Sequence, residues 1–351
     1  MPTPRPLLVV HPHFHGRRTG VTRHVESVVL RLGPRIDGRV VGASVDPALP
    51  RISMAEVVAR GREEPVVWHA HRNNELAAGL ALRRLAPCIR VIWTRHAAGR
   101  ASPSTRLLSR QADHRVALTE ESASYLKSPR TVIPHGVDTQ RFSPPPDREA
   151  AWRELGVGGR FGVGVVGRIR PAKGQADFVA AVRPLLEARS EWRGVLLGRV
   201  KRRHRRWLDR LPLEPLRHVA EVPEVAPWYR GLTVVVQPSR SEGFSLVALE
   251  AMASGCCVVA AALPHFPGLI EHGRDGFLYP PGKVDALRDV LGELMDDPAR
   301  ARRLGKAATR RVRERFGIDR EAAALRALYL ASVSGGPEPT GAVAEGLSST
   351  G

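Results

Sequence analysis

Short apolar runs alternate with helix-forming stretches along most of this chain. The runs have the length of strands that are buried on both faces, and the stretches between them are long enough for crossover helices. This alternation favours the α/β class with parallel sheets. Strands are predicted at residues 6–11, 65–68, 90–94, 115–118, 131–133, 161–166, 194–197, 233–237, 256–260 and 276–279.

The succession of strands is interrupted once, near the middle of the chain. Residues 143–147 are Ser-Pro-Pro-Pro-Asp, and a polar helix and the glycines of 156–159 follow them. Such composition is typical of a crossing between domains, and 351 residues suffice for two cores. Beyond residue 335, Gly, Pro, Ser and Thr prevail, a composition that cannot support packing. We therefore predict a first domain at 1–155, a second domain at 156–315, a last helix at 316–332 and a disordered tail at 333–351.

The chain carries a formal charge of +19, and only five of its 54 basic residues are lysines. A basic surface of this strength attracts nucleic acid or an anionic membrane, although arginine bias of the genome alone would give the same charge. The sequence has no zinc-finger spacing, basic zipper or aromatic RNA-binding motif, so we expect no nucleic-acid partner. It also has no secretory signal and no apolar run near the roughly 18 residues of a membrane span. These features predict a cytoplasmic protein that is peripheral on the anionic inner membrane.

Two glutamates, Glu242 and Glu250, are separated by seven residues in the segment 239–255. Ser245 fits the N-cap of a helix between them, and Gly255 fits the left-handed residue after that helix. A strand, a turn and a helix start present free backbone N–H groups to an anion. Glu250, a charge in an apolar helix, needs partners. The segment predicts a site for a nucleotide sugar, with a core helix that has one glutamate at its edge as the alternative.

A cationic loop follows the predicted strand 161–166. Residues 162–167 match G-x-G-x-x-G, but these glycines lie within the strand, and Pro171 disfavours a helix directly after it. A dinucleotide site is therefore the weaker interpretation. Arg168 and Lys173 share one short loop at the carboxyl end of a parallel strand, where two cations can clamp a diphosphate. Exposed surface charge is the alternative.

Together these segments resemble glycosyltransferase family 4, whose retaining sugar transferases carry paired glutamates and an arginine–lysine loop at this spacing. The resemblance extends over nearly the whole chain, to about residue 332. It implies two Rossmann-like domains facing across a cleft (GT-B type), with the last helix packing back on the first domain. It implies neither a metal nor a cofactor, and the sequence has no metal-ligand spacing.

The resemblance also assigns roles to single residues. Glu242, Arg168 and Lys173 would act at the reacting centre, and His96 would touch the donor sugar near the reacting carbon. The implied donor-binding residues are Gly20, Gly167, Gly243, Phe244, Ser245, Leu246 and Glu250. The implied acceptor-side residues are Thr19, His69 and His71. For these two histidines and for His96, an ordinary hydrogen-bonded loop residue is the alternative.

Residues 68–75, 134–142 and 228–230 look similar to mannosyltransferases of lipopolysaccharide-core assembly. This likeness implies GDP-mannose as the donor and a lipopolysaccharide-core or other glycolipid as the acceptor. Since the family changes its donor with few substitutions, UDP-glucose and UDP-N-acetylglucosamine remain alternatives. Two other classes also remain, a dinucleotide-dependent oxidoreductase and a non-catalytic basic binding protein.

Overall fold

The computed structural model describes residues 5–334, which divide into two compact units. The first unit contains the chain up to Gly136 and the segment from Gly317, and the second unit is Val137–Phe316. Each unit is built on one parallel sheet with helices, which is the α/β class predicted from the alternation. Within residues 5–334, no helix combines the length and the apolar character needed to cross a bilayer. The predicted tail lies, from residue 335 onward, outside the described residues.

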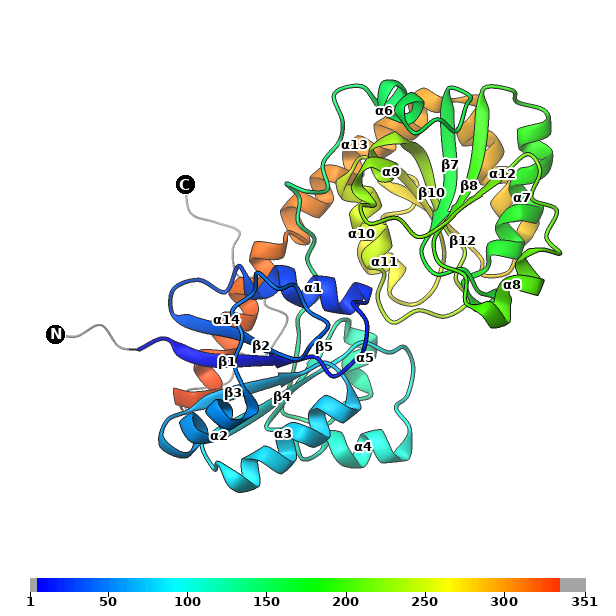
Figure 1. Cartoon of the computed structure of the whole chain (residues 1–351). Helices are drawn as coiled ribbons and strands as arrows, with labels where there is room; N and C mark the ends of the chain where they lie inside the picture. The colour runs from blue at the N-terminus through cyan, green and yellow to red at the C-terminus, as the bar shows by residue number, and fades with distance from the viewer. Residues whose placement is uncertain (1–4, 335–351) are drawn as a thin grey trace. The chain divides into compact units, whose positions relative to one another are not determined.

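The sheet of the first unit has six parallel strands in the order β2-β1-β3-β4-β5-β6. Figure 1 labels β1 to β5. After β1 the chain forms β2 on one side of it, and then returns to form β3, β4, β5 and β6 in order on the other side. The strand order therefore reverses between β1 and β3. In doubly wound sheets, ligands bind at the carboxyl ends of the strands at such a point. The strands are β1 (Leu7–Pro12), β2 (Ile36–Val41), β3 (Val66–Ala70), β4 (Ile89–Arg95), β5 (His114–Ala117) and β6 (Arg130–Val132).

Helices bury both faces of this sheet. Apolar side chains of α2 and α3 pack on one face, and those of α1 and α14 pack on the other. The last helix, α14, belongs to this core because Leu325, Leu328 and Tyr329 are buried against strand residues such as Val9 and Ile92. The helices are α1 (Gly20–Val29), α2 (Met54–Glu63), α3 (Asn73–Leu85), α4 (Pro103–Ser109), α5 (Glu120–Ser124) and α14 (Ile318–Ser334).

The sheet of the second unit also has six parallel strands, in the order β12-β11-β10-β7-β8-β9. Its first strand, β7, lies between β8 and β10; Val163, for example, is opposite both Gly194 and Val234. The strand order therefore reverses between β7 and β10. The strands are β7 (Phe161–Val166), β8 (Trp192–Leu197), β9 (Arg217–Val219), β10 (Leu232–Gln237), β11 (Cys257–Ala261) and β12 (Gly276–Tyr279).

Two apolar clusters cover the faces of the second sheet, one formed with α6, α9, α10 and α13, the other with α7 and α12. A short 3₁₀ turn, η1 (Pro171–Lys173), follows β7. The helices are α6 (Arg148–Glu154), α7 (Gln175–Glu187), α8 (Arg202–Leu208), α9 (Ala226–Gly231), α10 (Leu246–Ala253), α11 (Phe266–Leu269), α12 (Val284–Asp296) and α13 (Pro298–Arg315).

Residues 137–155 lie in the second unit, whereas the sequence analysis placed them in the first domain. The reason is the packing of α6. Trp152 is fully buried in the same apolar cluster as Tyr229. Arg148 donates to the carbonyl oxygens of Tyr229 and Arg230 at 2.9 and 3.0 Å. The proline run that suggested a domain crossing is thus a connection within the second unit.

Candidate functional site

The second unit brings two predicted segments together at the carboxyl ends of β7 and β10. These strands hydrogen bond directly in the sheet, although α7, β8, α8, β9 and α9 separate them along the chain. The loop after β7 carries the two predicted cations, and the loop after β10 carries the first predicted glutamate. Since this is where the strand order reverses, the fold itself places both loops at the expected ligand site.

Close backbone contact fixes the loop after β7. Gly174 has a φ of +71°, and a Cβ atom there would lie 1.9 Å from the carbonyl oxygen of Pro238, so only glycine allows this approach. Gln175 is buried, and its side chain donates to the carbonyl oxygen of Arg168 at 3.1 Å. Gly167, with a φ of +124°, ends the strand in a conformation that favours glycine. The two cations therefore sit on a rigid loop.

Lys173 and Glu242 form an ion pair between the two loops. The Lys173 Nζ atom donates to Glu242 Oε1 at 2.6 Å, and the side chains are 20% and 13% exposed. Glu242 Oε2 is buried and has no hydrogen-bond partner among the described residues. Arg168 is exposed, and its guanidinium pairs with no carboxylate of residues 5–334. The site therefore offers a free cation and a carboxylate oxygen that lacks a donor.

The helix start after Glu242 forms as predicted. Ser245 caps α10: its Oγ atom accepts from the Ala248 N–H and donates to Gln237 Oε1, both at 3.2 Å. Gly255 follows the helix with a φ of +77°. The remaining first-turn N–H groups of a helix lack intrahelical partners and favour an anion. Of the other predicted positions, Leu246 is the first residue of α10, and Gly243 and Phe244 lie in the loop just before its N-cap.

Glu250 is half-buried on α10, and its Oε2 atom accepts a hydrogen bond from the Tyr229 hydroxyl at 3.0 Å. Burial and the Glu250 carboxylate raise the pKa of Tyr229 well above its ordinary value, so the hydroxyl is a neutral donor. Sequence reasoning singled out residues 228–230 as a segment but gave Tyr229 no role, because Tyr229 lies on a different helix, α9, from Glu250.

His265, in the loop after β11, is a residue that sequence reasoning missed. It is 5% exposed, and its Nε2 atom has no partner in the described chain. Burial lowers the pKa of His265 to about 4, while Glu242 raises it and Lys173 lowers it, so the imidazole interacts with both partners of the ion pair. Its position after a strand at the carboxyl edge of the sheet is the signal that would have found it.

In the first unit, Thr19 and Gly20 lie at the start of α1, after β1. The Thr19 Oγ1 atom accepts from the Thr22 N–H at 3.3 Å, which makes it the N-cap, and also from Arg72 Nη2 at 3.1 Å. A Cβ atom on Gly20 would meet nothing within 4 Å. Packing inside the chain therefore does not require glycine at position 20.

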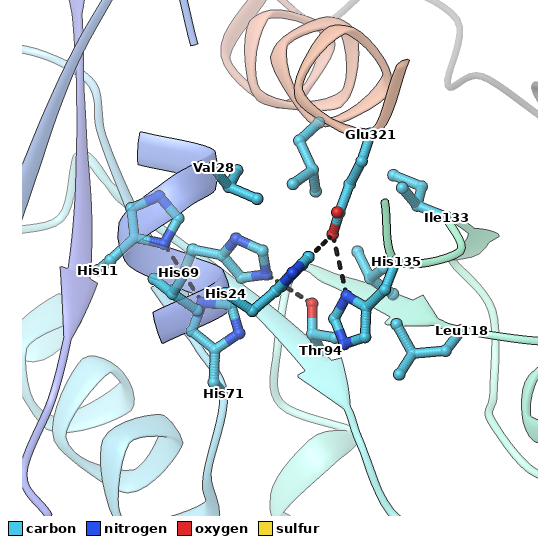
Figure 2. A pocket seen from close by; sticks show the side chains of 13 residues that line it. His11, His24, Val28, His69, His71, Thr94, Leu118, Ile133, His135 and Glu321 are labelled. Atoms are coloured by element: carbon cyan, nitrogen blue, oxygen red, sulfur yellow. Dashed lines mark hydrogen bonds and ion pairs between the residues drawn. The ribbon is translucent and has the colours of Figure 1, made fainter. Parts of the chain in front are cut away.

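A chain of hydrogen-bonded histidines runs through the first unit near the carboxyl ends of β1, β3, β4 and β6. His11 Nδ1 lies 3.2 Å from His71 Nε2, and His71 Nδ1 lies 3.2 Å from His96 Nε2. His96 Nδ1 lies 3.1 Å from His135 Nε2, and His135 Nδ1 lies 3.0 Å from Glu321 Oε1. Figure 2 shows Glu321 on α14 pointing down between His24 and His135. Residues far apart in the sequence thus form one continuous network.

Glu321 determines which nitrogen of each imidazole carries the proton. Burial raises the pKa of Glu321, but His24 and His135 together lower it well below its ordinary value, so the carboxylate can only accept. His135 must then donate from Nδ1 and accept at Nε2, and the same tautomer repeats back to His11. Burial lowers the pKa of His135 to about 4 and that of His11 to about 3, which keeps both neutral. The chain ends at His11 Nε2, which is buried without a partner.

The predicted histidines all lie in or beside this chain. His69 bonds to the Tyr329 hydroxyl and to Thr94 Oγ1, both at 2.6 Å. Both ring nitrogens of each predicted histidine are engaged within the first unit. Two groups bring atoms of zinc-ligand type within 4.8 Å of one another: His11, His69 and His71, and His24, His135 and Glu321. Hydrogen bonds join His11 to His71 and join both His24 and His135 to Glu321, so these contacts bring most of the six side chains together.

The G-x-G-x-x-G match is a packing feature of β7. A Cβ atom on Gly162 would lie 2.5 Å from the Trp152 ring, and one on Gly164 would lie 2.6 Å from Val195 Cγ2. The glycines therefore make room for neighbouring side chains. The 3₁₀ turn follows them, and α7 begins only at Gln175, so the helix start of a dinucleotide fingerprint is missing at this place.

Comparison with known proteins identifies the family. Residues 160–297 match the family described as glycosyl transferases group 1. The chain is 36% identical over 345 residues to the lipopolysaccharide core biosynthesis mannosyltransferase LpcC of Rhizobium leguminosarum bv. viciae, covering 94% of this chain and 97% of that protein. The chain belongs to the glycosyl transferases group 1. Membership of this family confirms the predicted glycosyltransferase and removes the oxidoreductase and the non-catalytic binding protein as alternatives.

A second relative and a solved structure agree with this result. The lipopolysaccharide core biosynthesis mannosyltransferase LpsB of Rhizobium meliloti (strain 1021) is 32% identical, over 93% of this chain and 97% of that protein. The structure of Anabaena Alr3699/HepE in complex with UDP-glucose covers 93% of this chain and all of its own, with a TM-score of 0.78 and 21% identity, a likeness of fold. The predicted GT-B fold class, with two Rossmann-like domains, is confirmed.

Proposed function

We propose that this group 1 transferase is a retaining mannosyltransferase that moves mannose from GDP-mannose to a lipopolysaccharide-core or other glycolipid acceptor at the inner membrane face. The names of LpcC and LpsB, which both match nearly the whole chain, support mannose and the lipopolysaccharide core. The formal charge of +19 supports the membrane location. Neither a metal nor a cofactor is part of the proposal.

The observation that carries the proposal is the Lys173–Glu242 pair, held where the strand order of the second sheet reverses. A diphosphate needs cations and backbone donors, and Lys173, the unpaired Arg168 and the start of α10 supply both. A sugar needs hydrogen-bond acceptors for its hydroxyls, and the partnerless Glu242 Oε2 supplies one. Glu250, oriented by the Tyr229 hydroxyl, would accept from the ribose hydroxyls.

In this mechanism the bond between the anomeric carbon and the diphosphate oxygen breaks while the acceptor oxygen bonds to the same face of that carbon. The departing phosphate oxygen takes the proton of the acceptor hydroxyl. Negative charge therefore develops on the diphosphate, and Arg168, Lys173 and the α10 N–H groups stabilise it. Exclusion of water from the site would suppress hydrolysis of the donor.

A thermal-shift panel with GDP-mannose, UDP-glucose and NAD tests the donor. At a hundredfold excess over Kd, a bound nucleotide sugar adds about 2.7 kcal/mol to stability, which raises Tm by several degrees. We expect this increase with GDP-mannose, and about a tenfold weaker affinity in Lys173→Met, because a charge-assisted contact with phosphate is lost. Lys283→Met removes an exposed lysine of the same unit and should leave the affinity unchanged.

Transfer from radiolabelled GDP-mannose to a truncated lipopolysaccharide core tests the reaction itself. An increase in Tm with UDP-glucose and none with GDP-mannose would move the assignment to the UDP-sugar alternative. Stabilisation by neither nucleotide sugar would contradict the proposed site. Flotation with anionic liposomes at low and high salt tests the membrane location, which requires association that salt reverses.

A further inference from the structure

A separate hollow of the first unit has a cavity volume of about 280 Å³. It is lined by the end of β4, by residues 96–98 and 100–102 that follow it, by His71 and Asn73 at the start of α3, and by Thr105 of α4. This volume is near the lower limit of ligand pockets and suits one sugar residue. Arg95 and Arg100 line the hollow, and none of its lining residues is acidic.

Arg95 is a buried cation without a counter-ion. Its side chain is 4% exposed, and no carboxylate of residues 5–334 pairs with it. The Nη2 atom donates to the carbonyl oxygens of Ala98, at 3.4 Å, and Gly99. The Nε atom has no partner, and Nη1 donates to no described group. An uncompensated buried charge costs several kcal/mol, so an anionic ligand would offset a cost that the free protein bears.

Two further features of the wall favour the same kind of ligand. Trp93 lies two residues before Arg95 on the same face of β4; it is 3% exposed, and its Nε1–H has no acceptor in the described chain. The N-cap of α3, Arg72, makes no side-chain hydrogen bond to the first N–H groups of the helix, and Asn73 at this helix start lines the hollow. The buried Glu75 carboxylate of the first turn, 2.7 Å from Arg72 Nη1, offsets the positive end of the helix dipole. The hollow therefore collects unsatisfied donors as well as positive charge.

We propose that this hollow binds the anionic group, a carboxylate or a phosphate, of an acidic sugar residue in the acceptor, with Arg95 and Arg100 as its cationic contacts. The inference rests on the proposed function, since it names the chemistry that the acceptor must carry. Of the acceptor-side residues predicted from the sequence, His71 lines the hollow, and so does His96, which the sequence assigned to the donor sugar. The Asn73 Nδ2 atom donates to Thr105 Oγ1 at 2.7 Å, and the Oδ1 atom of the same amide can accept from a sugar hydroxyl.

Binding is measured by NMR on the full chain, from the chemical shifts of the indole N–H groups of its six tryptophans. The variant Trp93→Phe identifies the signal that belongs to Trp93. The probes are glucuronate, glucose 6-phosphate, inorganic phosphate and neutral glucose. We expect glucuronate, glucose 6-phosphate or both to shift the Trp93 signal, and glucose to leave it unchanged at the same concentration. The acidic probe that shifts the signal identifies the anionic group as carboxylate or phosphate.

Arg100→Ala should weaken this binding about tenfold, as expected for one charge-assisted contact, and Arg95→Gln should weaken it more. Arg106→Ala is the matched control, since it removes an exposed arginine that does not line the hollow, and should change Kd less than twofold. The proposal is overturned if no acidic probe shifts the Trp93 signal, if glucose shifts it equally, or if Arg100→Ala and Arg106→Ala behave alike. A shift by inorganic phosphate alone would show an unspecific anion site and also overturns it.

The transfer assay separates this inference from the proposed function. If the hollow binds the anionic group of the acceptor, Arg100→Ala raises the KM for an acidic acceptor glycan about tenfold and leaves the GDP-mannose thermal shift unchanged. Transfer at wild-type KM in Arg100→Ala would remove the inference and keep the function. Loss of the GDP-mannose shift in the wild-type protein would remove the function, whatever the acidic probes do.

Discussion

At the scale of single residues, the Lys173–Glu242 pair is the contact on which the donor site depends. Its two side chains are only 20% and 13% exposed, so removing one partner leaves the other charge poorly solvated. We expect Lys173→Met and Glu242→Gln each to destabilise the protein, and the double variant to cost less than their sum. The coupling energy should be about 2 kcal/mol, measured by urea unfolding of the four proteins of a double-mutant cycle.

The Arg240–Asp177 pair is a control for this cycle on the same side of the second unit. Its N–O distance is 3.1 Å, but Arg240 is 62% exposed, so water screens the interaction. A cycle with Arg240→Met and Asp177→Asn should give less than about 1 kcal/mol. Equal coupling energies in the two cycles would show that the Lys173–Glu242 pair is ordinary surface charge, the alternative that the sequence left open.

Sequence reasoning predicted which residues the site contains better than it predicted their partners. Strand-end position and residue type pointed to Lys173 and Glu242, because the carboxyl ends of parallel strands meet at one edge of a sheet. The partner of Glu250, Tyr229, could not be found this way, since it lies within a helix. The histidine network ending at Glu321 depends on how α14 packs, which no local pattern contains.

At the scale of elements, the close contact of the loop after β7 with Pro238 predicts an unequal cost for two similar substitutions. Gly174 and Gly156 both have positive φ, +71° and +66°. A Cβ atom on Gly156 would meet nothing within 4 Å, whereas one on Gly174 would lie 1.9 Å from the Pro238 carbonyl oxygen. Gly156→Ala should cost about 1 kcal/mol of backbone strain, and Gly174→Ala at least about 3 kcal/mol.

Urea unfolding of both variants measures the difference. A displaced loop would also move Lys173, so Gly174→Ala should weaken the GDP-mannose thermal shift, while Gly156→Ala should keep it. Equal stabilities would mean that the loop adapts without cost, and that the rigid placement of the two cations was overestimated.

Most strands were predictable because central strands of a parallel sheet are continuous apolar runs. The two that were missed, β2 and β9, both lie at sheet edges. Their sequences, Ile-Asp-Gly-Arg-Val-Val and Arg-His-Val, are partly exposed and mix polar with apolar residues. An edge strand buries less surface, so its sequence gives a weaker signal even though its pairing is as regular as that of the others.

At the scale of the whole molecule, the buried histidines make the two units respond differently to acid. Burial lowers the pKa of His11 to about 3 and of His135 to about 4, and lowers the pKa values of His69, His71 and His96 as well. All five lie in the first unit, whereas His265 is the one buried histidine of this kind in the described part of the second. Lowering the pH should therefore destabilise mainly the first unit.

The sign of the effect follows from proton binding. Below about pH 6.5 the unfolded chain protonates these histidines, but the folded unit does not until near pH 4, so stability is full above 6.5 and falls as the pH drops through this window. In this window each histidine lowers the free energy of unfolding by about 1.4 kcal/mol per pH unit, so His11 and His135 alone lower it by about 3 kcal/mol per pH unit.

Pulse proteolysis in urea at pH 7, 6 and 5, with peptides assigned to each unit, should show that the first unit loses stability faster than the second as the pH falls. The exposed His272→Gln serves as the control and should leave both slopes unchanged. Parallel loss in both units would show that the histidine chain is not held neutral by its burial.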